Sequence, residues 1–285
     1  MERVKNIWVV GGDRRQAELA RLLAEDGHSV HPFALEQEIA CEESMEELEW
    51  ADCVILPLPA VTGEGWLNTP LCGQTHRVEE VLDQMEQGQL LCAGMVMPQL
   101  REEAERRGLI LCDYFAMEEL AVANAVPTAE GAIQIAMEEL PVTLHNARVL
   151  ILGYGRVARV TAQRMAVLGA KVTVAARSYE QLAWARVWGF STEYITGIAP
   201  WLCGYDLIVN TVPAQILRRE ELSALREGTV VIDLASRPGG VDFEAAKELG
   251  VKVMWALALP GKVAPRSAAQ YIKTAIYHRM EELGG

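Results

Sequence analysis

The clearest chemical signal in this sequence is a short glycine-containing run that follows an apolar stretch. It has the Gly-x-Gly-x-x-Ala form and comprises Gly153, Tyr154, Gly155, Arg156, Val157 and Ala158. In a dinucleotide-binding turn, the first glycine permits the sharp bend from strand to helix. The second glycine lets a pyrophosphate approach the backbone, and the small last residue lets the helix pack on the strand. The N–H groups and positive dipole end of the following helix would then bind the phosphates.

The elements around this run fit the same interpretation. Val149 to Leu152 is an apolar, strand-length segment, and Val157 to Leu168 has a helical pattern that Gly169 ends. A second strand is expected from Lys171 to Ala176. A glycine triplet alone is weak evidence, and its alternative is a glycine-containing loop in some other α/β domain. A complete strand–helix–strand unit favours the dinucleotide site.

The end of the second strand indicates which nicotinamide cofactor binds. An NAD site usually has Asp or Glu there, which bonds the ribose 2′-hydroxyl. This chain has Ala175, Ala176, Arg177 and Ser178 instead. Arg177 could pair with a 2′-phosphate in a bidentate way, and Ser178 could add a hydroxyl. The sequence therefore favours NADP, and the alternative is that Arg177 is a solvated residue at a strand end.

Composition excludes several other classes of function. The chain has 285 residues, enough for two domains, and its formal net charge of -13 offers no basic stripe for nucleic acid. The apolar stretches are only strand-length, so we expect no membrane span. The N-terminus leads almost directly into a strand, and we expect no signal peptide. All six cysteines are interpreted as reduced and structural, as in a cytoplasmic protein.

The pattern of elements predicts an α/β protein with two doubly wound parallel sheets, the second a Rossmann dinucleotide-binding domain. Residues 1–126 are expected to form a flavodoxin-like domain for substrate or partner. Residues 127–285 are expected to hold a helix bridging the domains, the NADP-binding domain and a C-terminal helix that could return to the first domain. The bridging helix is predicted from Pro127 to about Leu140, with Thr128 near its N-cap.

The chain also resembles, over nearly its whole length, the family formed by the A subunit of dipicolinate synthase in spore-forming bacteria. The resemblance is carried by the glycine turn and by the segments Gly11 to Gln16, Asn124 to Ile133, Ala176 to Ser178, Asn210 to Pro213, Asp233 to Gly240 and Leu259 to Ala264. It implies a two-domain architecture like that of D-hydroxyacid dehydrogenases. It also implies oxidation of dihydrodipicolinate to dipicolinate, and a second, flavoprotein-like subunit. A homo-oligomer is one of the states that the sequence allows.

One departure from the family has a conformational consequence. Leu257 and Ala258 stand where the family has a Pro-Gly pair. If residue 258 takes a positive φ, alanine at this position is costly.

A dicarboxylate substrate needs two anion-binding sites. The candidates are Arg14 and Gln16 at the start of the first helix, Asn124 and Thr128 in the predicted bridging region, and Arg237 after a strand. Each has a plainer interpretation: a helix start capped by Asp13, simple capping by Thr128, and a surface arginine in a Pro-Gly turn. Thr211, Val212 and Pro213 end a strand and are expected to contact the ribose or nicotinamide. No histidine stands out as a catalytic base, and the catalytic residue is unknown.

Two other functions stay open. The chain could be an NADP-binding scaffold or sensor subunit, with the chemistry on a partner. It could also be a generic hydroxyacid or amino-acid dehydrogenase, which would need a His or Lys base that the sequence does not reveal.

Overall fold

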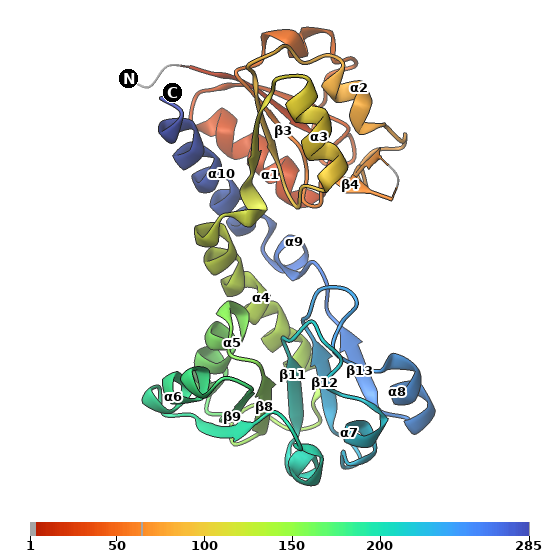
Figure 1. Ribbon diagram of the computed structural model, residues 1–285, viewed down its shortest axis with the longest axis vertical. Helices are drawn as coiled ribbons and strands as arrows, with labels where there is room; N and C mark the ends of the chain where they lie inside the picture. The colour runs from red at the N-terminus through yellow and green to blue at the C-terminus, as the bar shows by residue number, and fades with distance from the viewer. Residues whose placement is uncertain (1–3, 64, 285) are drawn as a thin grey trace. The chain divides into compact units, whose positions relative to one another are not determined.

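The computed structural model describes residues 4–63 and 65–284 of the chain, which divide into two α/β units. The first unit contains the described residues up to Asn124 together with those from Ala264 onward, and the second spans Ala125–Val263 (Figure 1). Each unit is built on its own parallel sheet, so the predicted fold class is confirmed.

The first unit has a five-stranded sheet in the order β2-β1-β3-β6-β7. Its strands are β1 (Asn6–Val10), β2 (Ser29–Phe33), β3 (Cys53–Ile55), β6 (Leu90–Ala93) and β7 (Ile110–Asp113). Every pair is parallel. This is the flavodoxin-like order. Strand β2 is added on one side of β1 and the later strands on the other, so the strand order reverses beside β1. Its helices are α1 (Arg14–Glu25), α2 (Val78–Leu82), α3 (Pro98–Arg106) and α10 (Pro265–Glu282).

The C-terminal helix α10 packs against α1 within this unit. Ile272 and Ile276 of α10 share a core with Leu19 and Leu23 of α1. At the end of α1, the Asp26 carboxylate accepts hydrogen bonds from Lys273 Nζ at 2.6 Å and from the Tyr277 hydroxyl at 2.7 Å. The last helix of the chain is therefore part of the first unit.

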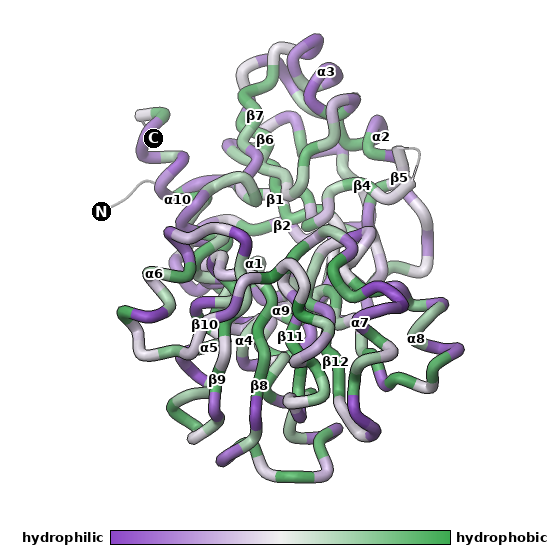
Figure 2. Tube along the Cα trace, turned by 60° about the horizontal axis from the view of Figure 1, so that its bottom comes forward, coloured by the Kyte–Doolittle hydropathy of each residue, from purple (hydrophilic) through white to green (hydrophobic). Residues whose placement is uncertain are grey.

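The second unit has a six-stranded parallel sheet in the order β10-β9-β8-β11-β12-β13. The strands are β8 (Arg148–Leu152), β9 (Lys171–Ala176), β10 (Ser191–Tyr194), β11 (Leu207–Asn210), β12 (Val230–Asp233) and β13 (Lys252–Trp255). Counted within the unit, this order is 3-2-1-4-5-6, the Rossmann topology. The central strands β8 and β11 are green along most of their length in Figure 2, as expected for strands covered on both faces.

Helices cover both faces of this second sheet. Helices α5 (Arg156–Val167) and α6 (Tyr179–Val187) pack on one face with part of α4 (Glu118–Glu139). The short helices α7 (Arg219–Ser223) and α8 (Phe243–Leu249) pack on the other. The strand order reverses between β8 and β11, because the first three strands are added on one side of this point and the last three on the other. Ligands are therefore expected beside the carboxyl ends of these two strands.

The predicted start of the helix at Pro127 is wrong. Helix α4 begins at Glu118 and runs to Glu139, with Pro127 inside it. Thr128 is therefore an interior residue and not an N-cap. The segment before the proline has two early carboxylates and several alanines, which favour a helix. Burial of Leu120 in one core and of Ile133 and Ala136 in another stabilises the whole helix despite the hydrogen bond that the proline removes.

Some short elements were not predicted from the sequence. Edge strand β10 is polar, and the segment after β13 contains helix α9 (Leu259–Val263). The segment after β3 contains a small hairpin of β4 (Val61–Thr62) and β5 (Trp66–Leu67). Within the described residues, no helix is long and apolar enough to span a membrane, and no three His, Cys, Asp or Glu side chains cluster as a metal site. All six cysteines are free.

Candidate functional site

The glycine turn links β8 to α5 at the point where the strand order of the sheet reverses. Gly153 has φ +94°, a conformation that side chains disfavour, and its N–H donates to Ala175 O at 2.8 Å. A Cβ at Gly153 would lie 2.6 Å from Thr211 Oγ1. The glycine is thus required both by its backbone angle and by the close approach of the strand-end residue Thr211.

Gly155 lies in a different environment. A Cβ built on Gly155 would meet no atom within 4 Å. Gly155 is the N-cap of α5, and no side chain of the described residues caps this helix end. Because the first turn of a helix has N–H groups without intrahelical acceptors, open space here leaves donors for an anion. Ala158, one turn on, is fully buried against the sheet.

Tyr154, between the two glycines, points into the protein. Its ring packs edge-to-face on Phe190, and the guanidinium of Arg159 lies 5.3 Å from its centroid. Arg159 Nε also donates to Tyr154 O at 3.2 Å. Burial raises the pKa of the Tyr154 hydroxyl, and Arg159 partly offsets this. Tyr154 and Arg159 therefore hold the turn in place from beneath, and Tyr154 does not fill the space beside Gly155.

Arg177 and Ser178 follow β9, the neighbour of β8. Arg177 is exposed, and within the described part of the chain its side chain forms no hydrogen bond or ion pair. Ser178 is the N-cap of α6, and its hydroxyl accepts the Gln181 N–H at 3.4 Å. The residues before them, Ala175 and Ala176, are buried and apolar. This strand end thus carries an available cation and no carboxylate.

Thr211, Val212 and Pro213 follow β11, the other neighbour of β8. The Thr211 hydroxyl donates to Leu152 O at 2.8 Å, which ties this strand end to the end of β8. Thr211 and Val212 are partly exposed and Pro213 is exposed. The sheet order therefore brings all the predicted cofactor residues to one edge of one unit: the glycine turn in the middle, Arg177 and Ser178 on one side, and Thr211 to Pro213 on the other.

A buried polar network behind this edge was missed by the sequence reasoning. The Asp233 carboxylate is fully buried and accepts hydrogen bonds from Asn210 Nδ2 at 2.7 Å, Ala235 N at 3.0 Å and Gly240 N at 2.8 Å. Asn210 in turn binds Val212 through both its amide atoms. A carboxylate with three donors fixes the loops after β11 and β12 in one arrangement. An Asp at the end of an otherwise apolar strand, with paired glycines close behind, was the available signal.

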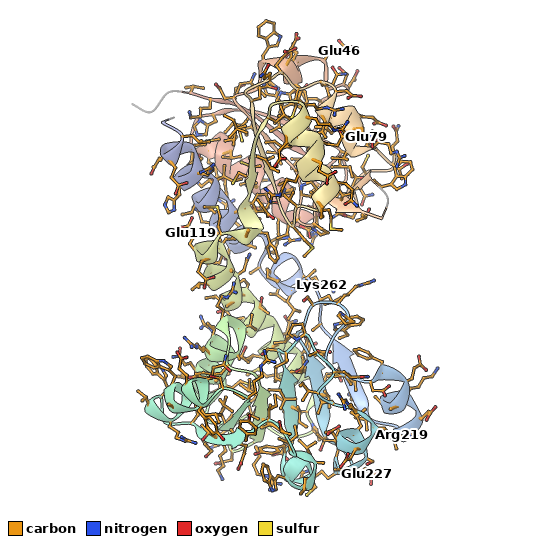
Figure 3. All side chains as sticks on the ribbon, in the orientation of Figure 1. Glu46, Glu79, Glu119, Arg219, Glu227 and Lys262 are labelled. Atoms are coloured by element: carbon orange, nitrogen blue, oxygen red, sulfur yellow. The ribbon has the colours of Figure 1, made fainter. Side chains whose placement is uncertain are left out.

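Arg237 follows β12 and is exposed at the same sheet edge. Its guanidinium lies 5.8 Å from the Trp255 ring centroid, and the Trp255 indole N–H donates to Ala235 O at 3.0 Å. The aromatic ring faces the guanidinium, so a cation–π contact favours this position of the charged end while it stays accessible to solvent. Lys262, labelled in Figure 3, is exposed on α9 in the same unit.

Arg14 and Gln16 lie at the start of α1 in the first unit. Arg14 is exposed, and its Nε donates to Glu38 at 2.7 Å. Gln16 is almost fully buried, and its Nε2 donates to Leu56 O at 2.9 Å. Asp13 is the N-cap, as the plainer interpretation expected. An anion at this helix start would therefore have to exchange with Glu38 for the guanidinium of Arg14.

Asn124 and Thr128 are both partly exposed residues of α4, four positions apart and hence on the same side of the helix. Asn124 falls in the first unit and Thr128 in the second. Since Thr128 is inside the helix, its hydroxyl is not used as an N-cap.

The histidines hold structural contacts. Their partners are Tyr277 for His28, Glu42 for His31, Glu80 for His76 and Glu119 for His278, the last at 3.0 Å on α4 (Figure 3). His145 lies in the turn before β8, against Gly169. His145 is the one histidine of the second unit, and it precedes β8, so it does not lie at the carboxyl edge where the cofactor residues meet.

Comparisons with known proteins place this geometry among dehydrogenases. Residues 6–115 match the family model for the N-terminal domain of the dipicolinate synthase A subunit, and residues 120–283 match "Alanine dehydrogenase/PNT, C-terminal domain". The A subunit of dipicolinate synthase of Bacillus subtilis (strain 168) is 32% identical over 285 residues, which cover 97% of this chain and 96% of that protein.

Solved structures agree with the sequence matches. The crystal structure of the dipicolinate synthase A subunit from Bacillus halodurans superposes with a TM-score of 0.88 at 30% identity, covering 96% of this chain and 97% of that one. A transhydrogenase from Sinorhizobium meliloti superposes with a TM-score of 0.73 at 17% identity, covering 98% and 94%, and shows the fold alone. The resemblance predicted from the sequence motifs is confirmed over nearly the whole chain.

Proposed function

Because the chain belongs to the family of the dipicolinate synthase A subunit, we propose that it is an NADP-dependent oxidoreductase that converts dihydrodipicolinate to dipicolinate. Its second unit is a nicotinamide dinucleotide-binding domain of the dehydrogenase type. The observation that carries the choice of NADP is Arg177, an exposed and available guanidinium at the end of β9 where an NAD site would have a carboxylate.

The residues of the second unit fit a dinucleotide. The uncapped start of α5 and the open space at Gly155 supply N–H donors to a pyrophosphate. Arg177 would pair with the 2′-phosphate, with Ser178 beside it. Thr211 and Val212 would contact the ribose or the nicotinamide, in positions that the Asp233 network holds fixed. Preorganised contacts of this kind reduce the cost of ordering the site on binding.

The proposed reaction removes one hydride and one proton from the substrate ring. The nicotinamide would supply the hydride acceptor, the proton would be released to bulk water, and the ring would become an aromatic pyridine. The gain of aromaticity supplies much of the driving force, so the protein mainly has to hold the reacting carbon in place and exclude water. This fits the second unit itself, whose one histidine, His145, precedes β8 and does not lie at the carboxyl edge of the sheet.

The substrate carries two carboxylates that need polar partners. Arg237 is the strongest candidate, because Trp255 supports it at the ligand edge of the Rossmann sheet. Arg14 and Gln16 at the start of α1 are candidates for a carboxylate, as are Asn124 and Thr128 on α4. For Gln16, burial beneath the helix start favours a supporting role through Leu56 O.

The name of the relative in Bacillus subtilis supports two further parts of the proposal. That relative is named as one subunit of an enzyme, and we infer a second, flavoprotein-like subunit, the dipicolinate synthase B subunit, as the partner of this chain. We also place the protein in the cytoplasm of a sporulating bacterium, in keeping with its free cysteines.

The direct test combines the purified chain with NADP and freshly prepared dihydrodipicolinate, with and without the second subunit, and follows NADPH by absorbance. Turnover by the chain alone supports the proposal. Nucleotide binding with no turnover unless the second subunit is present would instead support an NADP-binding scaffold. Faster turnover of hydroxyacids or amino acids than of dihydrodipicolinate would identify a generic dehydrogenase.

A further inference from the structure

A surface groove of the second unit lies at the end of α5 that is farther from the glycine turn. It has a volume of about 780 Å³ and runs between α4 and α5, which lie side by side in Figure 1. Its lining residues come from these two helices and the residue that ends α5: Glu130, Ile133, Gln134, Met137 and Glu138 from α4, and Gln163, Arg164, Val167 and Leu168 from the end of α5. The glycine turn is at the opposite, N-terminal end of α5.

The groove exposes more apolar surface than a solvated helix pair requires. Val167 is 88% exposed, Met137 is 55% exposed and Leu168 is 41% exposed. The core beneath is already filled by Ala136, Ala162 and Met165. Contiguous exposed apolar side chains with a polar rim are typical of a protein–protein contact.

Charges of opposite sign border the two sides of this groove. The α4 side carries Glu130 and Glu138, and the α5 side carries Arg164, whose Nε lies 3.5 Å from Glu130 Oε1. The surface of α5 thus presents a cation followed, three and four residues later, by two apolar side chains. These three residues lie on one stripe of the helix. The two apolar side chains of this stripe are complementary to the apolar groove, and Arg164 is complementary to the acidic side chains that border it.

We propose that the groove is a dimer interface, in which the end of α5 of each copy packs into the α4–α5 groove of a second copy of this chain. A two-fold contact requires a self-complementary surface, because each residue i that touches residue j is matched by j touching i. The groove meets this condition. Val167 and Leu168 of one copy enter the apolar groove of the other, and Arg164 of each copy pairs with Glu138 of its partner.

The first test measures oligomeric state with the full chain. Sedimentation equilibrium at micromolar concentration is expected to show a dimer. Val167→Glu and Met137→Glu each place two charges in a two-fold apolar contact, so either should raise the dimer dissociation constant at least about 100-fold. NADP affinity should stay unchanged, since both side chains are exposed and lie far from the glycine turn. A wild-type chain that is monomeric up to about 100 µM, a weak affinity for a specific interface, overturns the proposal.

A matched control separates this groove from exposed apolar surface in general. Val187 on the neighbouring helix α6 is 75% exposed and does not line the groove. Val187→Glu should leave the dimer intact. If it dissociates the dimer while Val167→Glu does not, the interface lies elsewhere and the proposal fails.

Charge reversal tests the pairing of the two copies. Arg164→Glu and Glu138→Arg should each weaken the homodimer, about tenfold or more, because every two-fold contact then holds two like-charge pairs. Mixing the two single variants restores both opposite-charge pairs, so a heterodimer with near wild-type affinity is expected. Failure of the mixture to associate, or association of the groove with the flavoprotein-like second subunit in place of a second copy, would overturn the two-fold arrangement.

Discussion

Replacing Gly155 by serine separates the cofactor role of this residue from its structural role. The backbone of Gly155 is extended, with φ −81° and ψ −165°, so serine adopts it without strain. An added Cβ meets no atom within 4 Å. Serine is a good N-cap, and replacing glycine by serine at such a position changes stability by only a few tenths of a kcal/mol. The melting temperature should therefore change by about 1 °C or less.

Nucleotide affinity should respond in the opposite way. The hydroxymethyl group occupies the space that a pyrophosphate needs, and its oxygen competes for the N–H donors of α5. Loss of one charge-assisted hydrogen bond costs about 1.5–3 kcal/mol, which is roughly a 10- to 150-fold rise in the dissociation constant. NADP and NAD should be affected alike, because both contain the pyrophosphate.

Isothermal titration calorimetry with both nucleotides measures this effect. Gly204→Ser is the matched control, because a Cβ at Gly204 also meets no atom within 4 Å and Gly204 lies outside the glycine turn. Unchanged NADP affinity in the Gly155 variant would refute our assignment of the pyrophosphate to this helix start. So would an equal loss in the Gly204 variant.

Four further predictions concern single side chains. Arg177→Ala should raise the dissociation constant of NADP about tenfold and that of NAD less than about twofold, and equal losses would remove the 2′-phosphate role. Arg237→Ala should raise KM for dihydrodipicolinate about tenfold at unchanged NADP affinity, and an unchanged KM would exclude Arg237 from the substrate site. Ala258→Gly should stabilise the protein by about 0.5–1 kcal/mol, seen as a melting temperature raised by about 1–4 °C, because Ala258 has φ +57°; an unchanged or lower value would contradict this. At Asp26, burial raises the pKa, but hydrogen bonds, first among them that from Lys273, outweigh it and hold the pKa below its ordinary value. The stabilisation is therefore present above the unfolded-state pKa of about 4 and is lost as pH falls below it. Asp26→Asn should lower the melting temperature at neutral pH, and this difference from the unaltered protein should shrink in acid. A difference that grows in acid would contradict the argument.

The sequence predicts the cofactor half of this fold well because local rules act there without competition. A buried strand, a glycine turn and an amphipathic helix specify one another within about 30 residues. The strand–helix–strand unit from Arg148 to Ala176 accordingly matches its predicted limits within a residue. The sequence makes alanine at position 258 costly only if its φ is positive, and the structure meets this condition with φ +57°.

The misses have physical causes that no local pattern contains. The sequence predicts a helix start at Pro127 because Thr128 suits an N-cap and a carboxylate follows early. The buried side chains of α4 on both sides of the proline outweigh the hydrogen bond that it removes, so the helix continues through it. Asp233 and Asn210 meet only when β11 and β12 are paired in register. Their hydrogen bond is a property of the sheet and not of either strand alone.

The α4–α5 groove could not be predicted from the sequence either. The predicted helix included Ile133 but left open which side chains would be covered by its neighbours. That Val167 and Met137 stay exposed depends on the packing of two helices on a sheet.

Calorimetric titration of NADP and NAD into the unaltered chain tests the central claim most directly. We predict one NADP bound per chain, at least about tenfold more tightly than NAD, because the 2′-phosphate adds the contact with Arg177. No heat at millimolar nucleotide, or tighter binding of NAD than of NADP, would contradict the account.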